Sequence, residues 1–255
     1  MRILVAGGAG YIGSVLVPVL QDHGYDVDVV DLLWFGNHLP EDTRVIQKDL
    51  FQLGVAELKP YDQVVFLAGL SNDPMAEYSP ALNFIQNGAL PSYLAFQAKQ
   101  AGVKRFVYAS SCSVYGYTVN ELYDEDAPVT CAYPYGISKL EGENGVLQLQ
   151  DENFSTIALR QGTVCGHSPR MRFDLIVNTI VASAVGTVTS MGVQDLVHAA
   201  GGERKLARLV RRYKSSKYKG REDKSAHIAQ KVARTASRLK GRKVDWTEVE
   251  AILEG

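Results

Sequence analysis

Short runs of consecutive apolar residues alternate along the first part of the chain with longer segments in which apolar residues recur every three or four positions. The runs predict strands over residues 3–6, 27–30, 45–47, 64–67, 105–109 and 155–159. The helical spacing predicts helices over residues 14–23, near residues 79–102 and from about residue 133 onwards. Apolar strands that alternate with helices are typical of a parallel sheet covered on both faces. The pattern therefore predicts an α/β fold with a doubly wound parallel sheet.

Glycines follow the first predicted strand directly, in the sequence Gly7-Gly8-Ala9-Gly10-Tyr11-Ile12-Gly13. In this spacing Gly7 permits a tight turn, Gly10 lets backbone N–H groups approach a pyrophosphate, and Gly13 lets the next helix pack closely on the strand. The N-terminus of that helix stabilises the phosphate charge. The turn, with Tyr11 and Ile12 inside it, therefore predicts a dinucleotide site in a Rossmann-type sheet, whereas a glycine pattern without this context would indicate only a flexible loop.

Asp31 ends the second predicted strand, 18 residues after Gly13. A carboxylate at this place can accept hydrogen bonds from both ribose hydroxyls and would repel a 2′-phosphate. The next basic residue is Arg44, so no neighbouring cation compensates this repulsion. The position favours NAD over NADP, and an ordinary strand-end carboxylate is the alternative.

Further cofactor contacts are expected where the third and fourth predicted strands end. They are Asp49, Leu50, Leu67, Ala68 and Gly69. Asp49 and Leu50 are placed to hold the adenine edge, with a plain turn as the alternative. Residues 67–69 include small side chains that suit a backbone passing close to the cofactor.

A tyrosine and a lysine stand four residues apart in Tyr135-Gly136-Ile137-Ser138-Lys139, so both lie on one face of a helix. A neighbouring cation favours the phenolate and lowers the tyrosine pKa, which makes Tyr135 a usable acid or base. The hydroxyl residues of 110–116 follow the fifth strand, at the carboxyl edge where ligands bind in open α/β sheets. Together with the glycine turn, these two segments are far more specific than any of them alone.

In these motifs and their order, residues 1–185 resemble the extended short-chain dehydrogenase/reductase superfamily, in its nucleotide-sugar epimerase and dehydratase group. The resemblance implies that Ser111, Tyr135 and Lys139 are catalytic, that Lys139 also holds the nicotinamide ribose, and that Asn87 positions the active site. The segment 159–166 resembles the family's L-R-x-x-N-V-x-G pattern, with Thr163 where asparagine is usual. A homodimer through helices of the cofactor domain is also expected from the resemblance.

The resemblance implies a nucleotide-sugar substrate and epimerisation at C4. Tyr135 takes a proton from a sugar hydroxyl, NAD takes the hydride from the same carbon, Ser111 hydrogen-bonds the oxygen, and hydride returns to the other face. Family 4,6-dehydratases carry Asp-Glu after the catalytic hydroxyl residue, where this chain has Cys112-Ser113. This difference disfavours a dehydratase and leaves an epimerase or a simple dehydrogenase/reductase. The expected substrate contacts are Ser71, Asn72, Ser111, Cys112, Ser113 and Thr163, although 71–74 reads equally well as a solvated loop.

Composition narrows the class of protein. Of 255 residues, 46% are hydrophobic and 22% are charged, which is ordinary for a globular protein. Three widely spaced cysteines exclude a disulfide scaffold and a C-x-x-C pair, and we expect no metal site.

The first strand begins at Ile3, which leaves no room for a signal peptide. The uncharged stretch 175–193 holds too many polar residues for a membrane span and predicts a buried helix and a short strand. We therefore expect a reduced, cytoplasmic protein.

Charge divides the chain into two regions. Residues 186–255 hold 16 basic and 8 acidic residues, whereas residues 1–185 hold 11 and 20. We therefore predict an NAD-binding domain over 1–185 and a short, atypical, basic and mainly helical region over 186–255, where family members carry a longer substrate domain. Three interpretations of this region stay open: a reduced substrate cap, an appendage that binds an anionic partner such as RNA, and a solvated or replaced end without a ligand. In the last two cases the protein would be a weakly catalytic NAD-binding module.

Overall fold

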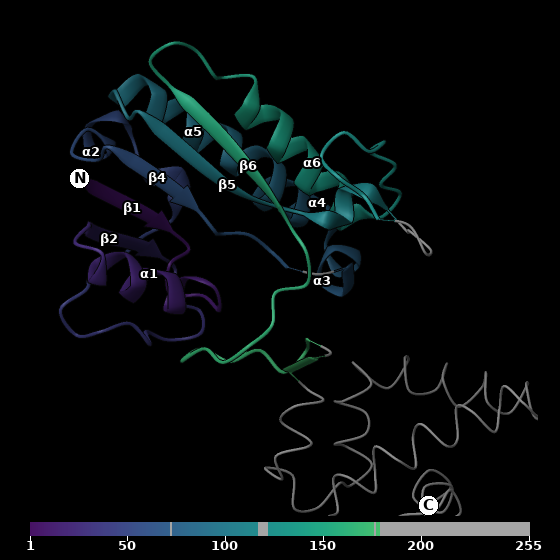
Figure 1. The fold of residues 1–255 in the computed structure, drawn as a ribbon, viewed down its shortest axis with the longest axis horizontal. Coiled ribbons are helices and arrows are strands. Elements are labelled where there is room, and N and C mark those ends of the chain that lie inside the picture. The colour runs from purple at the N-terminus through teal and green to yellow at the C-terminus, as the bar shows by residue number, and fades with distance from the viewer. Residues whose placement is uncertain (72, 117–121, 176, 179–255) are drawn as a thin grey trace, which may run out of the picture. The chain divides into compact units, whose positions relative to one another are not determined.

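The computed structural model describes residues 1–71, 73–116, 122–175 and 177–178, and these residues contain a six-stranded parallel sheet (Figure 1). Its strands are β1 (Arg2–Ala6), β2 (Asp26–Asp31), β3 (Arg44–Gln47), β4 (Gln63–Phe66), β5 (Arg105–Ser111) and β6 (Ser155–Gln161). They are ordered β3-β2-β1-β4-β5-β6, and every neighbouring pair is parallel. All six predicted strands and the doubly wound α/β fold are thus confirmed.

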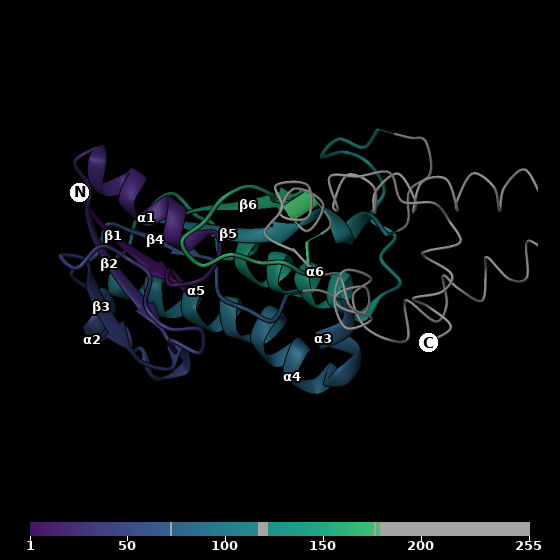
Figure 2. The same ribbon diagram turned by 90° about the horizontal axis from the view of Figure 1, so that it is seen from below.

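Helices cover both faces of this sheet (Figure 2). Helix α1 (Gly13–Asp22) packs on one face, where Val17 meets Ile3 and Val5 of β1. Helices α5 (Leu90–Ala101) and α6 (Pro134–Leu147) lie on the other face, where Leu94 belongs to the core cluster that includes Leu4 and Ala6. Alternate residues of β1 are therefore buried on opposite faces, as a continuous apolar run predicts. The remaining helical segments are α2 (Val55–Leu58), α3 (Asp73–Tyr78), α4 (Pro80–Phe84), and the short turns η1 (Leu50–Gln52), η2 (Ile85–Ala89) and η3 (Cys112–Tyr115).

The chain reverses its winding between β1 and β4. It builds β2 and β3 on one side of β1 and then crosses to place β4 on the other side. Backbone hydrogen bonds hold both neighbours to the end of β1: Gly7 donates to the Val30 carbonyl at 2.8 Å, and Leu67 donates to the Ala6 carbonyl at 2.8 Å. Ligands of open α/β sheets bind at such a switch point, outside the carboxyl ends of the strands.

The helix predicted near residues 79–102 is confirmed in extent, because α4, η2 and α5 follow one another from Pro80 to Ala101, but it is not one regular α-helix. Between α4 and α5 the backbone widens into one π-helical turn at η2, which contains Asn87. Pro91 has no N–H to donate to the Asn87 carbonyl one turn earlier. That carbonyl instead accepts a hydrogen bond from the Tyr108 hydroxyl of β5 at 3.0 Å. The wide turn thus connects this helix to β5.

Several expectations fall outside the described residues. They concern Asn72, most of the uncharged stretch 175–193 and the whole basic region 186–255. Contacts group Met1–Val164 with Ser168–Met171 into one compact unit, and the rest of the chain into a second. The predicted domain boundary near residue 185 stays a prediction.

A buried carboxylate lies toward the amino ends of the strands. Asp28 of β2 accepts hydrogen bonds from the Arg2 guanidinium at 2.8 Å and from the Tyr61 hydroxyl at 2.6 Å, and Arg44 lies 3.3 Å away. The guanidinium of Arg2 also stands over the Tyr61 ring. Burial and the neighbouring carboxylate raise the pKa of Tyr61 above its ordinary value. Asp28, Arg2 and Tyr61 are called the amino-edge cluster below.

Asp28→Asn is expected to lower the free energy of unfolding by about 3 kcal/mol, because it leaves the charge of Arg2 without its buried partner. Urea unfolding measures the change. The control is Asp26→Asn, since Asp26 lies on the same strand and also pairs with Arg2 but is exposed. Its loss should stay below about 1 kcal/mol. Equal losses in the two variants would show that burial does not set the contribution of this cluster.

Candidate active site

The glycine turn is shaped by its close approach to β4. Gly7 has a φ of +80°, and a methyl group there would lie 2.5 Å from the backbone nitrogen of Ala68. Only glycine adopts this conformation and this spacing without strain. Ser14 fixes the other side of the turn, because its hydroxyl donates to the Gly10 carbonyl at 2.8 Å. Tyr11 and Ile12 lie between these points, ahead of α1, where backbone N–H groups meet a phosphate in proteins with this motif.

The Asp31 carboxylate lies beside the turn. Its two oxygens accept backbone N–H groups from Ala9 at 3.0 Å and from Leu33 at 2.8 Å. Leu33 adopts a left-handed conformation with φ of 56°, which brings its amide back to the carboxylate. A carboxylate has about four lone-pair positions, so both oxygens can still accept ribose hydroxyls. The residues present therefore fit the adenosine ribose of a dinucleotide.

The other predicted cofactor residues have diverse surroundings. Asp49 caps η1 by accepting the Phe51 amide at 2.9 Å, and Leu50 is buried in the core. Leu67 and Ala68 are half-buried just after β4, and Gly69 is exposed with a φ of +139°. All five lie beyond the carboxyl ends of β3 and β4. The arrangement agrees with the predicted cofactor edge, while the individual contacts stay predictions.

Asn87 is completely buried, and its side-chain oxygen has no partner within the described residues. Its side-chain amide donates to the Leu70 carbonyl and to the Asn83 side chain, both at 2.8 Å. Its Oδ1 accepts no hydrogen bond there and faces the α-carbon of Gly69, where a methyl group would overlap it. A buried acceptor without a donor is costly. Asn87 therefore brings an acceptor to the place where the chain leaves β4.

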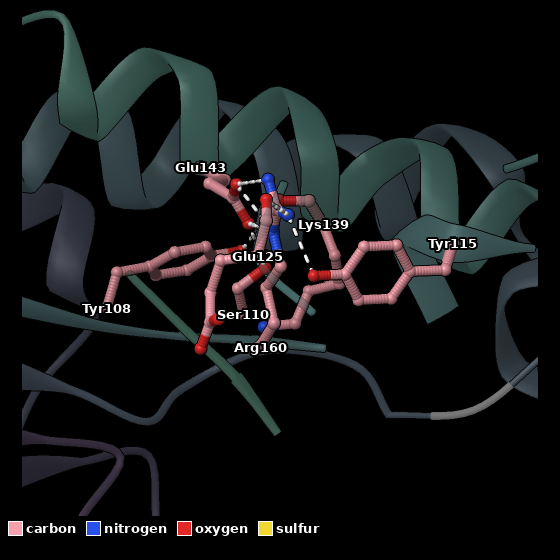
Figure 3. Close-up of polar contacts among 7 residues, drawn as sticks. All are labelled: Tyr108, Ser110, Tyr115, Glu125, Lys139, Glu143 and Arg160. Atoms are coloured by element: carbon pink, nitrogen blue, oxygen red, sulfur yellow. Dashed lines mark hydrogen bonds and ion pairs between the residues drawn. The ribbon is translucent and has the colours of Figure 1, made fainter. Parts of the chain in front are cut away.

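The predicted catalytic residues come from β5 and α6. Ser111 is the last residue of β5, and its hydroxyl donates to the Ser113 hydroxyl at 3.1 Å. Lys139 of α6 is buried, its ammonium donates to the Ala109 carbonyl at 2.7 Å, and it stands 4.7 Å from the Tyr108 ring centre (Figure 3). Tyr135 lies one turn earlier on α6 and is half-buried. The bond from Lys139 to Ala109 thus joins α6 to β5 two residues before Ser111, close to the end of the strand.

Burial determines the protonation of Lys139. Loss of solvent lowers the pKa of its ammonium to about 7. A lysine in this state exchanges its proton near neutral pH and responds strongly to any charge placed beside it.

The expected substrate residues surround the same edge of the sheet. Cys112 is exposed and Ser113 half-buried in η3, Ser71 is half-buried after β4, and Thr163 is exposed after β6. They lie beyond three neighbouring strands, so one ligand at the carboxyl edge could reach several of them. Asn72 lies outside the described residues. These contacts also stay predictions.

Two residues near the glycine turn were not predicted from the sequence. The Ser168 hydroxyl, buried, donates to the Tyr11 carbonyl at 2.8 Å, across 157 positions of the chain. The guanidinium of Arg170 lies 3.8 Å from the ring centre of Phe35, in the loop that follows Asp31. No local sequence pattern indicates such contacts. They place a segment from beyond β6 against the predicted cofactor turn.

Among the described residues, no three histidine, cysteine or acidic side chains gather closely enough to hold a metal ion. In the same part of the chain, no helix has the length and apolar character needed to cross a membrane.

The fold and the site together define a Rossmann-type cofactor-binding α/β protein with a serine, tyrosine and lysine set at the carboxyl edge. Comparison with protein-family models gives a match over residues 3–218 to the NAD dependent epimerase/dehydratase family. The chain belongs to this family.

Curated relatives with similar sequences include two bacterial proteins named UDP-glucose 4-epimerase. The one from Corynebacterium glutamicum is 32% identical over 144 residues, which cover 55% of this chain and 44% of the relative. The one from Azospirillum brasilense is 32% identical over 184 residues, 67% of this chain and 51% of the relative. The chain thus spans about half the length of these relatives.

Solved structures with a similar fold include proteins in complex with NAD. MoeE5 in complex with UDP-glucuronic acid and NAD has a TM-score of 0.63 at 33% identity, covering 72% of this chain and 61% of that one. The UDP-glucose 4-epimerase of Thermus thermophilus, in complex with NAD, has a TM-score of 0.67 at 26% identity, covering 76% and 64%. In both cases the structural similarity covers about three quarters of this chain.

Lys139→Met is expected to remove a pH dependence of stability. Between about pH 7 and the ordinary lysine pKa of 10.5, the unfolded chain binds a proton that the folded protein has released, so stability rises with pH in this window. From about pH 7 to about pH 9, the wild-type protein should gain about 2 kcal/mol relative to the variant. Urea unfolding at several pH values measures the difference. Lys104→Met, which removes a solvent-exposed lysine, corrects for the change in net charge. A constant difference between wild type and Lys139→Met would contradict the low pKa.

Proposed function

We propose that this protein is an NAD-dependent nucleotide-sugar epimerase that acts through transient oxidation at C4. The observation that carries the proposal is Lys139, buried one helical turn beyond Tyr135 and bonded to β5 two residues before Ser111. The names of the curated relatives and the NAD complexes among the similar structures support it.

The residues around the switch point would hold the cofactor. The turn that begins at Gly7 would receive the pyrophosphate, Asp31 would accept the adenosine ribose hydroxyls, and Lys139 and Asn87 would lie on the nicotinamide side. Bound NAD supplies the acceptor for the hydride that leaves C4 of the sugar. The buried acceptor of Asn87 without a donor, and the remaining lone-pair positions of Asp31, fit a polar group with hydroxyl and amide donors.

In this proposal Tyr135 carries out the proton transfer. Its phenolate accepts the proton of the 4-hydroxyl as hydride leaves C4 and the C4–O bond becomes a carbonyl. After the 4-keto sugar has turned over, hydride returns to the other face of C4 and Tyr135 returns the proton to the oxygen. Lys139 favours the phenolate in its ammonium form, which is the main form below its pKa of about 7, because an adjacent positive charge lowers a tyrosine pKa. Ser111 donates a hydrogen bond to the sugar oxygen on which charge develops.

Within the family, the residues after Ser111 favour epimerisation. Cys112 and Ser113 stand where 4,6-dehydratases carry the carboxylates used for water elimination, so that activity is disfavoured. A nucleotide-sugar dehydrogenase or reductase uses the same tyrosine and lysine, and analysis of the products distinguishes it from an epimerase. The identity of the sugar is left to a substrate panel. Homodimer formation and binding of an anionic partner by the basic region 186–255 stay predictions.

Tyr135→Phe is expected to reduce sugar-dependent turnover by about 10²- to 10⁴-fold, because the phenol is the group that accepts the proton. The measurement is reduced-nicotinamide absorbance, with product analysis, after UDP-, GDP- and dTDP-sugars are added to NAD-loaded protein. NAD affinity should stay within about threefold of wild type, since the glycine turn is untouched.

Tyr25→Phe is the matched control, because Tyr25 packs beside α1 at the amino end of β2. Its turnover should equal that of the wild-type protein. If folded wild-type protein binds NAD but reduces it with no sugar of the panel, the epimerase proposal fails and an NAD-binding module with a basic region takes its place.

A further inference from the structure

A second buried carboxylate lies beside the predicted catalytic residues. The side chain of Glu143 is only 3% exposed and forms an ion pair with Arg160 of β6 (Figure 3). Its Oε1 accepts hydrogen bonds from Arg160 Nη2 at 2.7 Å and Nε at 3.0 Å. Its Oε2 accepts the Ser110 hydroxyl at 2.6 Å. The carboxylate is therefore fully engaged, from two strands at once.

The other end of the Arg160 guanidinium reaches further residues. Nη1 donates to the Tyr115 hydroxyl at 2.9 Å and to the Glu125 carbonyl at 3.2 Å. The guanidinium also lies 5.1 Å from the centre of the Tyr115 ring. Arg160 thus ties η3 and the chain near Glu125 to the same carboxylate.

The elements joined in this way are those that carry the predicted catalytic residues. Ser110 directly precedes Ser111 on β5 and stands opposite Arg160 in the parallel register of β5 and β6. Glu143 lies one turn beyond Lys139 on α6. A displacement of α6 along β5 would therefore have to break the bonds of Glu143.

We propose that Glu143 and Arg160 are positioning residues that fix α6, with Tyr135 and Lys139, at a set place relative to Ser111. The inference rests on the proposed function. It adds Glu143, which no sequence motif includes, and gives a role to Arg160, the arginine of the segment 159–166. Neither residue touches the sugar or the cofactor in this assignment; each acts through the elements that it joins.

The energetics of buried ions support a role of this kind. Removing two charges from water is costly, and well-packed apolar residues often replace a buried ion pair without loss of stability. The forked geometry of Arg160, by contrast, specifies distance and direction, which apolar contacts do much less well. The pair therefore contributes more to a defined arrangement than to net stability.

Electrostatics link Glu143 to the predicted catalytic residues through Tyr108. Burial, and then the charges of Tyr135 and Glu143, raise the pKa of Tyr108 above its ordinary value, so both groups act on one buried phenol. The structure brings Lys139 and Glu143 from α6, Tyr108 from β5 and Arg160 from β6 to this region (Figure 3). Arg160 neutralises a carboxylate that would otherwise oppose the Tyr135 phenolate.

The first arm of the test compares Glu143→Gln and Arg160→Met with wild type. We expect kcat per NAD-binding site to fall by about 10- to 100-fold, as displacements of about 1 Å cost catalysis, with NAD affinity and sugar KM within about threefold. Asp28→Asn is the matched control, because the amino-edge cluster is the same kind of carboxylate, arginine and tyrosine group far from the site. It should lower the melting temperature and leave kcat per site unchanged. Equal kcat losses in Asp28→Asn would overturn the proposal.

The second arm is the double variant Glu143→Met with Arg160→Met. We expect the melting temperature to return toward the wild-type value while kcat per NAD-binding site stays low. Recovery of both quantities would show that the pair serves stability alone and would overturn the proposal.

The third arm needs no sugar and separates this inference from the proposed function. Phenolate absorbance is titrated in NAD-loaded wild type, Arg160→Met and Asp28→Asn, each referenced to the same protein with Tyr135→Phe. Arg160→Met should raise the apparent pKa of Tyr135, whereas Asp28→Asn should not change it. An unchanged Tyr135 titration in Arg160→Met would overturn the inference, even if every sugar is turned over. A wild-type protein without turnover but with the expected shift would reject only the proposed function.

Discussion

The close passage of the glycine turn past the end of β4 is the constraint on which the rest of the structure depends. β1 pairs with β2 on one side and with β4 on the other, so the chain leaving β1 has to turn within the space that Ala68 leaves free. Gly7 satisfies this requirement through its left-handed backbone. The same turn points α1 so that its N-terminus faces the carboxyl edge of the sheet, where an anion is stabilised. The same backbone turn therefore determines both the connection from β1 to α1 and the predicted cofactor site.

The catalytic side of the site depends on the packing of α6 against the widened helix turn at η2. The carbonyl of Asn87 lacks a helical donor because of Pro91, and it is satisfied by the Tyr108 hydroxyl. The same hydroxyl lies 3.4 Å from the Lys139 carbonyl, and the Lys139 ammonium lies over the Tyr108 ring. Tyr108 therefore contacts both the irregular turn at η2 and Lys139, and holds them together. Irregular helix turns of this kind are often found at functional sites.

The strands, the doubly wound class of the sheet and the glycine turn could be predicted because each has a local signal: apolar runs, helical spacing and glycines at fixed positions. The spacing of Tyr135 and Lys139 predicts that they share one helix face, and α6 contains both, while their catalytic role stays a prediction. The turn at η2 could not be predicted, since it results from Pro91 acting together with a hydroxyl on β5. The contact of Ser168 with Tyr11 spans 157 positions and leaves no local pattern. The one signal that could have indicated Glu143 is its place one turn after Lys139 on the same helix face.

Two buried ion clusters of similar composition lie at opposite ends of the sheet, and their positions argue for different roles. The amino-edge cluster holds Asp28 where β1, β2 and β4 begin, far from the carboxyl edge, so it can act on function only through stability. Glu143 and Arg160 lie where β5 and β6 end, on the helix that carries Tyr135 and Lys139 and on the strand beside it. An ion pair is a poor means of adding stability in either place, because desolvation offsets the attraction. It is a good means of setting direction, since the forked guanidinium bonds only in its own plane. In the proposed mechanism, that directional bond at the carboxyl edge sets how Tyr135 and Lys139 of α6 face Ser111 of β5.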